Sequence, residues 1–201
     1  SVNNAFEAGK VNQSCRVDVT AFFSDMYYYL DENNYLIKEK FDHQLIDITN
    51  NSYNNISFKN IIFCEGVATN NNPFFSNIPI QPNKGHCLKI TLNEVPDSYI
   101  IKKKHFLFNL RNDLYYYGGT YDRFDKTINI NDESVEELKS GLMEIYKNKF
   151  EIRDVNVAFR ATVADRRPIL GRHQEHHNFY IFNGLGARGV YNGSYFSKVL
   201  F

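Results

Sequence analysis

Apolar residues recur at two spacings along the chain, and these spacings predict helices and strands. Apolar positions three and four residues apart fall in two segments, 18–30 and 132–147, which predicts two amphipathic helices. Asp18 stands where it can cap the first helix, and we expect this helix to bury one face. The apolar stripes consist of Val19, Phe22, Phe23, Met26 and Leu30 in the first helix and of Val135, Leu138, Leu142, Ile145 and Tyr146 in the second.

Shorter apolar runs elsewhere in the chain predict strands. Three of them lie in the first third of the chain, at 35–41, 44–48 and 57–64. A longer antiparallel set is predicted at 80–92, 99–110, 113–120 and 155–163. Asparagine-rich segments at 50–55 and 70–72 interrupt the runs and indicate surface turns. Strands followed by a helix laid on one face indicate an α+β domain.

Composition narrows the class of protein. With 201 residues, 43% of them hydrophobic, the chain is large enough for one or two domains with a real core. No apolar run approaches the roughly 20 residues that span a membrane. The 23 basic and 23 acidic side chains balance to a net charge of zero, which gives no electrostatic argument for a nucleic-acid or membrane surface.

The cysteines bear on compartment and reactivity. Cys15, Cys64 and Cys87 are odd in number and lack CxxC spacing, which predicts a reduced, cytoplasmic protein. A catalytic thiol at Cys64 or Cys87 is one interpretation, since His86 adjoins Cys87. Both lie in strand-like apolar runs, however, which favours a role as small buried hydrophobes.

The most informative stretch is the last quarter of the chain. AFRATVADRRPILG, at 158–171, places an arginine in a strand and then an aspartate and a proline in a turn. FYIFNGLGARGV, at 179–190, is a second apolar strand that continues into a glycine-rich turn and a helix. Such a turn offers backbone amides to a nucleotide-type cofactor with phosphate or polarised oxygens.

This stretch resembles the C-terminal signature of the FAD-dependent oxidoreductases related to D-amino acid oxidase and glycine oxidase. Asp165, Pro168 and Gly171 have the spacing of that signature. Segments resembling the same family follow one another in the same order, at 9–30, 60–69, 78–90 and 105–120. The resemblance implies FAD as cofactor, a small amine or amino acid as substrate, and an antiparallel-sheet substrate domain with a helix on one face.

One part of the family pattern is absent. Members begin with a strand, a GxGxxG turn and a helix that bind the FAD pyrophosphate, and this chain does not begin in that way. Its glycines at 184, 186 and 189 have the GxGxxG spacing but lie near the end of the chain, in the turn that the resemblance assigns to another part of the cofactor. We therefore interpret the chain as the C-terminal part of a longer flavoprotein, inactive alone. The predicted parts are a partial α/β FAD-binding domain at 1–77, the α+β substrate domain at 78–172, and a closing strand and helix at 173–201. Exposed apolar edges would then favour pairing with another chain, including a homo-oligomer, or partial disorder.

The resemblance also assigns roles to residues. Arg160 stands where the family holds the substrate carboxylate, a role that suits the planar fork of arginine. The alternative is that Arg160 pairs with Asp165 and holds the strands together. Lys84 is a candidate near-flavin cation. Predicted FAD contacts are Cys64, Glu65 and Gly66 in one turn and Gly184, Leu185, Gly186, Ala187, Arg188, Gly189 and Val190 in another.

Two further features concern the substrate. Leu-Gly-Ala-Arg-Gly at 185–189 is similar to the loop of the oxidase domain that acts on the modified wobble uridine of tRNA, so a tRNA-linked amine stays open. Phe106 stands where glycine oxidase has a tyrosine, which disfavours glycine-like substrates. Two hypotheses follow: an oxidoreductase that oxidises a C–N bond by hydride transfer to flavin, and a ligand-binding module that kept the fold without the redox chemistry.

A histidine cluster invites a metal interpretation. It consists of His173, Glu175, His176 and His177. The cluster lies in a polar turn, and its spacing does not match a helix face such as HExxH. We therefore expect a solvated loop and no metal site.

Overall fold

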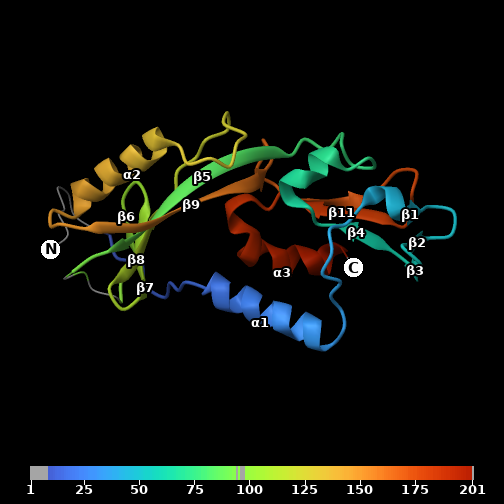
Figure 1. Cartoon of the computed structure of the whole chain (residues 1–201), viewed down its shortest axis with the longest axis horizontal. Helices are drawn as coiled ribbons and strands as arrows, with labels where there is room; N and C mark the ends of the chain where they lie inside the picture. The colour runs from blue at the N-terminus through green and yellow to red at the C-terminus, as the bar shows by residue number, and fades with distance from the viewer. Residues whose placement is uncertain (1–8, 94, 96–97, 201) are drawn as a thin grey trace.

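The structure is a computed structural model that describes residues 9–93, 95 and 98–200. Residues 1–8 of the predicted first segment and residue 201 of the last lie outside the described residues. Figure 1 shows an elongated molecule with a large sheet at one end and two smaller sheets at the other. The long strands β5 (Gln81–Thr91) and β9 (Glu151–Thr162) reach from the large sheet toward the smaller ones.

The large sheet contains the predicted antiparallel set, but the run 99–110 forms two strands that pair with each other, at 101–102 and 106–111, instead of one. In the described residues its order is β6-β7-β8-β5-β9, and every pairing is antiparallel. The remaining strands are β6 (Ile101–Lys102), β7 (Phe106–Arg111) and β8 (Leu114–Gly118). Pairing of β5 with β9 extends from Gln81 opposite Thr162 to Thr91 opposite Glu151. This register decides which side chains of the two strands share a face.

Helix α2 (Asp132–Ile145) covers one face of this sheet, as predicted. The side chain of Asn131 caps it by accepting a hydrogen bond from the amide of Ser134 at 3.0 Å. Its apolar stripe packs on alternate residues of the strands and completes the core. The buried residues are Leu88, Ile90, Leu92, Leu107, Tyr115, Tyr117, Leu138, Leu142, Ile145 and Tyr146. The predicted α+β class is confirmed.

A second core lies at the other end of the molecule. There β4 (Ile61–Phe63) pairs in parallel with β11 (Phe179–Asn183), which also pairs with the antiparallel strand β10 (Ile169–Arg172). The core between these strands and the loop after them consists of Phe63, Phe75, Phe179 and Ile181. β10, which lies within the predicted substrate domain at 78–172, belongs to this sheet and not to the large one. The predicted domain bounds stay a prediction.

Of the two strands predicted before residue 50, one is absent and the other is shorter than predicted. Residues 35–41 form no strand. The run 44–48 contains the 3-10 turn η1 (His43–Leu45), capped by Asp42, and leaves the two-residue strand β1 (Ile46–Asp47). β1 belongs to a small sheet with β2 (Ser52–Tyr53) and β3 (Ile56–Ser57). An apolar run becomes a strand only where another strand completes its hydrogen bonds, and the described residues supply none to 35–41.

Helix α1 (Val19–Glu32) begins after its predicted cap, since Asp18 accepts hydrogen bonds from the amides of Thr20 and Ala21. The expectation that α1 buries one face is wrong, because no residue of α1 is buried within the described residues. Phe22 is 44% exposed and Phe23 56%. The helix lies near α3 (Gly189–Leu200) in Figure 1, but no described element covers its apolar stripe.

A buried ion pair fixes the loop that follows β8. Lys84 is fully buried, and its Nζ donates to Oδ2 of Asp125 at 2.6 Å and to the carbonyl oxygen of Asn129. The backbone of Lys84 also pairs with that of Asp122 in an isolated bridge. A buried ammonium without a partner is very unfavourable, so this pair holds the loop against β5.

We expect Asp125→Asn to destabilise the protein more than Lys84→Met. The first change leaves a buried ammonium without its carboxylate, whereas the second removes the charge and keeps an apolar side chain of similar length. Urea unfolding at neutral pH measures both midpoints. Equal midpoints for the two variants would contradict the expectation.

The same pair predicts a pH dependence. The hydrogen bond from Lys84 is the first cause that lowers the pKa of Asp125 from 3.8 to about 2. Because this carboxyl has the lower pKa in the folded state, its stabilisation is complete above about pH 4 and is lost as the pH falls through about 2. Part of the acid-induced fall in the wild-type midpoint should therefore be absent in Asp125→Asn.

Candidate active site

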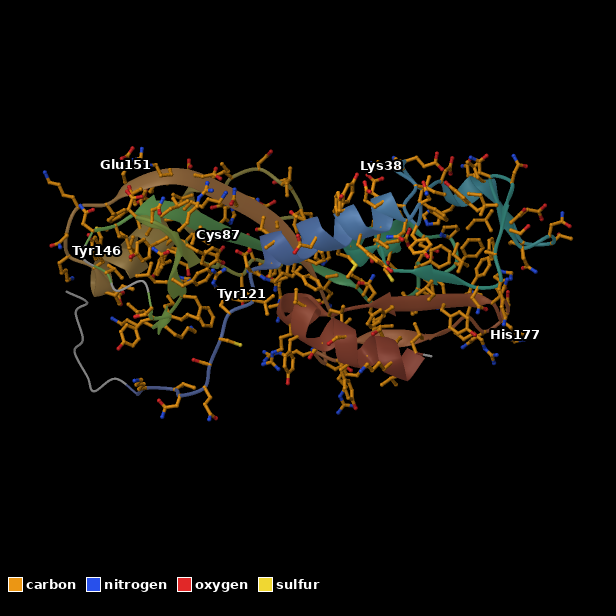
Figure 2. The ribbon with its side chains drawn as sticks, turned by 90° about the horizontal axis from the view of Figure 1, so that it is seen from below. Lys38, Cys87, Tyr121, Tyr146, Glu151 and His177 are labelled. Carbon is orange, nitrogen blue, oxygen red and sulfur yellow. The ribbon has the colours of Figure 1, made fainter. Side chains whose placement is uncertain are left out.

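The face of the large sheet opposite α2 carries Arg160, and Figure 2 looks onto this side of the molecule. The Arg160 guanidinium donates from Nη1 to the carbonyl oxygen of Thr120 at 3.1 Å. Its Cζ lies 4.4 Å from the ring centroid of Tyr121, a cation–π contact. No carboxylate pairs with it among the described residues, and Asp165 instead accepts from the amide of Arg167 at 3.0 Å. The geometry therefore shows a half-buried arginine without an acidic partner.

Glycines make room for this guanidinium. A Cβ built on Gly85 would lie 2.6 Å from Nη2 and 2.7 Å from Cζ of Arg160. A Cβ built on Gly119 would lie 2.9 Å from Nη2. Any side chain at these two positions would occupy space that the arginine now fills, so both glycines serve its placement.

The rest of this face is aromatic and half-buried. Tyr116 stacks on Phe108 with ring centroids 4.6 Å apart, and Cζ of Arg16, which precedes α1, lies 4.8 Å from the Phe108 centroid. Burial is the first cause that raises the pKa of Tyr116 to about 12. Its hydroxyl therefore stays protonated near neutral pH and can donate a hydrogen bond.

Cys64 and Cys87 are not activated. Burial is the largest cause that raises the pKa of both Cys64 and Cys87. Cys87 and His86 are consecutive on β5, so their side chains point to opposite faces. The His86 ring accepts a hydrogen bond at Nε2 from the amide of Asn131 at 3.0 Å. This geometry supports the interpretation of Cys87 as a small hydrophobe. For Cys64 the expectation of a buried side chain is wrong, because Cys64 is exposed.

A second group of candidate residues lies at the carboxyl ends of β4 and β11. Because these strands are parallel, the turn after β4 and the turn after β11 meet at one edge of the sheet. Gly66, Gly184 and Gly186 have φ angles of 59°, 70° and 57°, a region that favours glycine. Ligands of open α/β sheets bind at this edge. The structure thus brings together the two predicted cofactor turns.

Asn183 joins these two turns, and the sequence analysis missed it. Its Nδ2 donates to the carbonyl oxygen of Gly66 at 2.8 Å and to Oγ1 of Thr69 at 2.7 Å. Its Oδ1 accepts from the amide of Gly184 at 2.7 Å. Asn183 is 4% exposed. A polar residue directly before a glycine at the end of an apolar strand was the available sequence signal.

The glycine turn after β11 also contacts the end of β9. It includes the 3-10 turn η3 (Gly186–Arg188), which has no side-chain cap and leads directly into α3. A Cβ on Gly186 would lie 3.7 Å from Cγ2 of Thr162, two residues beyond Arg160 on the same strand. Arg160 and the turn are therefore neighbours, and the amides at the start of η3 and α3 face no capping side chain among the described residues.

Two predicted site residues have their side chains engaged elsewhere. Glu65 accepts hydrogen bonds from Nε2 of His43 at 2.8 Å and from Nδ2 of Asn72 at 2.7 Å, so its carboxylate links loops. Lys84 points to the opposite face of β5 from Arg160 and binds Asp125. This geometry does not support Lys84 as a near-flavin cation, and at Glu65 only the backbone is available to a cofactor.

The histidine cluster forms a folded turn. Nδ1 of His173 accepts from the amides of Glu175 and His176, both at 3.1 Å. The rings of His173 and His176 stack with centroids 4.8 Å apart and pack on Phe74 and Phe75. Within the described ranges, no group of three or more potential ligand side chains has a geometry that would hold a metal ion.

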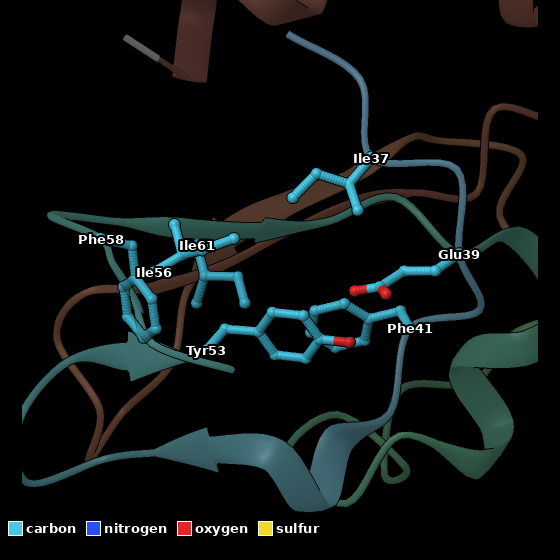
Figure 3. Close-up of a pocket in the computed structure, with 7 residues that line it drawn as sticks. All are labelled: Ile37, Glu39, Phe41, Tyr53, Ile56, Phe58 and Ile61. Carbon is cyan, nitrogen blue, oxygen red and sulfur yellow. The ribbon is translucent and has the colours of Figure 1, made fainter. Parts of the chain in front are cut away.

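An apolar hollow of about 320 Å³ lies beside β4, away from Arg160. In Figure 3 the rings of Phe41 and Tyr53 lie against each other on one side of it, with the Glu39 carboxylate nearby. Its lining residues are Ile37, Glu39, Phe41, Tyr53, Ile56, Phe58 and Ile61. None of the predicted site residues lines this hollow.

A family model described as FAD dependent oxidoreductase matches residues 37–200. The chain belongs to this family. Among solved structures, iminodiacetate oxidase from Chelativorans sp. BNC1 superposes with a TM-score of 0.63 and 22% identity, over 72% of this chain and 42% of that protein. Glycine oxidase from Bacillus cereus gives 0.62 and 15% over the same shares. Fructosamine oxidase from Aspergillus fumigatus gives 0.55 and 14%, over 72% and 39%.

These likenesses confirm the fold of the oxidoreductase family, and they cover less than half of each relative. The turns at 64–66 and 184–190 offer uncapped amides beside positive-φ glycines, and such donors fit the polar oxygens of a cofactor such as FAD. In the described residues, no helix is long and apolar enough to span a membrane.

We expect Gly85→Ala to displace the Arg160 guanidinium without unfolding the protein, because the new methyl group meets the mobile end of a side chain. A crystal structure of the variant would show the arginine moved from Thr120, and the thermal midpoint should change little. Gly171→Ala is the matched control, since a Cβ there has no atom within 4 Å. An unmoved guanidinium in Gly85→Ala would contradict this account of the glycine's role.

We expect Asn183→Ala to destabilise the protein by about 2–3 kcal/mol, because it leaves several buried polar partners unpaired. Asn178→Ala is the control: Asn178 belongs to the same region, and its side chain makes one exposed hydrogen bond, to Asn51. Urea unfolding compares the two variants. A cost at Asn183 no larger than at Asn178 would show that the three bonds do not hold the turns.

Proposed function

We propose that this chain is the C-terminal part of an FAD-dependent oxidoreductase that oxidises the C–N bond of an amino acid or secondary amine. The observation that carries the proposal is Arg160, a half-buried cation without an acidic partner in the described structure, placed beside the glycine turn. A buried charge needs a counter-charge, and the carboxylate of an amino acid fits the guanidinium fork.

Each part of the site would have one task. Arg160 would bind the carboxylate and so fix the direction of the substrate. Thr120 and Tyr121 would hold the guanidinium from two sides. The residues 64–66 and 184–190 would hold the flavin-ring end of FAD, which accepts a hydride from the carbon next to the substrate nitrogen when it is bound. Orientation is then the main contribution of this chain.

The FAD pyrophosphate would be bound by a nucleotide-binding part outside this chain, since the chain spans about two fifths of the relatives it matches. Several surfaces here would receive that part: the apolar stripe of α1, the unpaired outer edge of β4 in the described sheet, and the hollow in Figure 3. These surfaces support the predicted division into a partial FAD-binding domain and a substrate domain. The 201-residue chain alone would be inactive.

We further propose a cytoplasmic enzyme for a small amine, with a tRNA-linked amine as the second substrate class. A homo-oligomer stays a prediction that follows from the exposed apolar surfaces.

The first test of the proposed function is the visible absorption spectrum of the full-length gene product, purified without added cofactor. A flavin band that bleaches anaerobically with an amine supports the proposal. A folded, colourless protein that takes up no FAD supports the ligand-binding module instead.

In the full-length enzyme, we expect Arg160→Met to raise KM for an amino acid substrate by about 10–100-fold, because hydrogen bonds to a charged group are lost. Oxidation of an amine without a carboxylate should be unaffected. Steady-state kinetics with both substrates separate these effects. Arg153→Met is the control, because Arg153 lies on the same strand but is exposed and paired with Glu151. Equal losses on both substrates would rule out carboxylate binding.

A further inference from the structure

Asn83, on β5, is a buried polar residue whose oxygen has no partner. The residue is 3% exposed, and no donor among the described residues reaches its Oδ1. One other buried side-chain atom in the described chain has no hydrogen bond, Nε2 of His105, but a carboxylate oxygen of Glu137 lies 3.5 Å from it. A buried acceptor without a donor costs free energy, so a structural role does not explain this residue.

The register places Asn83 directly beside Arg160. The two are paired residues of β5 and β9, and paired residues of antiparallel strands point to the same face. The guanidinium lies over Gly85, two residues further along β5, which confirms that Asn83 and Arg160 share this face. Asn83 therefore belongs to the face that carries the proposed substrate site.

The glycine turn bounds the same position from the other side. Gln81, two residues before Asn83, pairs with Thr162, and Thr162 is the residue that Gly186 approaches. Asn83 thus stands between the Arg160 guanidinium and the turn at 184–190. A ligand held by both would lie against Asn83. Asparagine is also disfavoured within strands, so local propensity gives no reason for its presence.

We propose that Asn83 is a ligand-binding residue whose Oδ1 accepts a hydrogen bond from an N–H group of the molecule bound between Arg160 and the glycine turn. The inference rests on the proposed function and deepens it. Two N–H groups have this chemistry, one on the flavin ring and one on the substrate amine. In either case, the ligand supplies the donor that the described residues lack.

The test is Asn83→Val in the full-length enzyme, with Asn156→Val as the matched control. Asn156 lies on the same face of β9 but is exposed and bonded to Asp154. Because valine leaves no unpaired acceptor, the urea midpoint of ligand-free Asn83→Val should not fall. A structural role for Asn83 would lower this midpoint, and that result would overturn the inference.

Two ligand measurements separate the sources of the N–H group. If the flavin donates, Asn83→Val weakens FAD binding about tenfold in a fluorescence titration. If the substrate amine donates, FAD binding is unchanged and kcat/KM for an N-alkylglycine falls about tenfold. The dissociation constant of the matching alkylthioacetate, which has no N–H, then stays the same.

Failure of the Asn83 inference can be distinguished from failure of the proposed function. A wild-type enzyme that binds FAD and oxidises an amine, with Asn83→Val unchanged in every ligand measurement, overturns this inference alone. A wild-type protein that binds neither FAD nor an amino acid overturns the proposed function and this inference together.

Discussion

The antiparallel pairing of β5 with β9 is the constraint on which the rest of the structure depends. Alternate residues on one face of the pair complete the core under α2. The other face carries Asn83 and Gly85 from β5 and Arg160 from β9, and the far end of β9 meets the glycine turn after β11. This one register therefore sets the core, the position of Arg160 and its distance from the glycine turn. A shift by one residue would move all of these side chains to the wrong face.

The candidate site carries polar groups that lack partners in the described structure. Its central arginine has no acidic partner in the described residues, and the oxygen of its strand neighbour Asn83 has no donor there. By contrast, Lys84, adjacent to Asn83 but on the opposite face, is fully paired with Asp125. The chain thus satisfies its buried charge on the core side and leaves polar groups unsatisfied on the site side. Functional sites retain such local costs because a ligand offsets them.

The chain also leaves apolar surfaces exposed. The stripe of α1 has correct helical spacing and a correct cap, and nothing in the described structure covers it. The hollow beside β4 is lined mainly by aromatic and aliphatic side chains. In the described residues β4 is an edge strand of a mixed sheet, because it pairs only with β11. The proposed nucleotide-binding part would complete it.

The sequence determined the α+β class, both amphipathic helices with the cap of the first, most strands of the large sheet and the oxidoreductase family, because spacing, capping and motif order are local signals. The tertiary structure alone decided the rest. It showed that 35–41 has no strand partner and that α1 is uncovered. It also placed the side chains of Lys84 and Arg160 on opposite faces of the large sheet. Asn183 became the link between the turns after β4 and β11. These outcomes depend on contacts between residues far apart in sequence, such as Asn183 and Gly66, which no local pattern encodes.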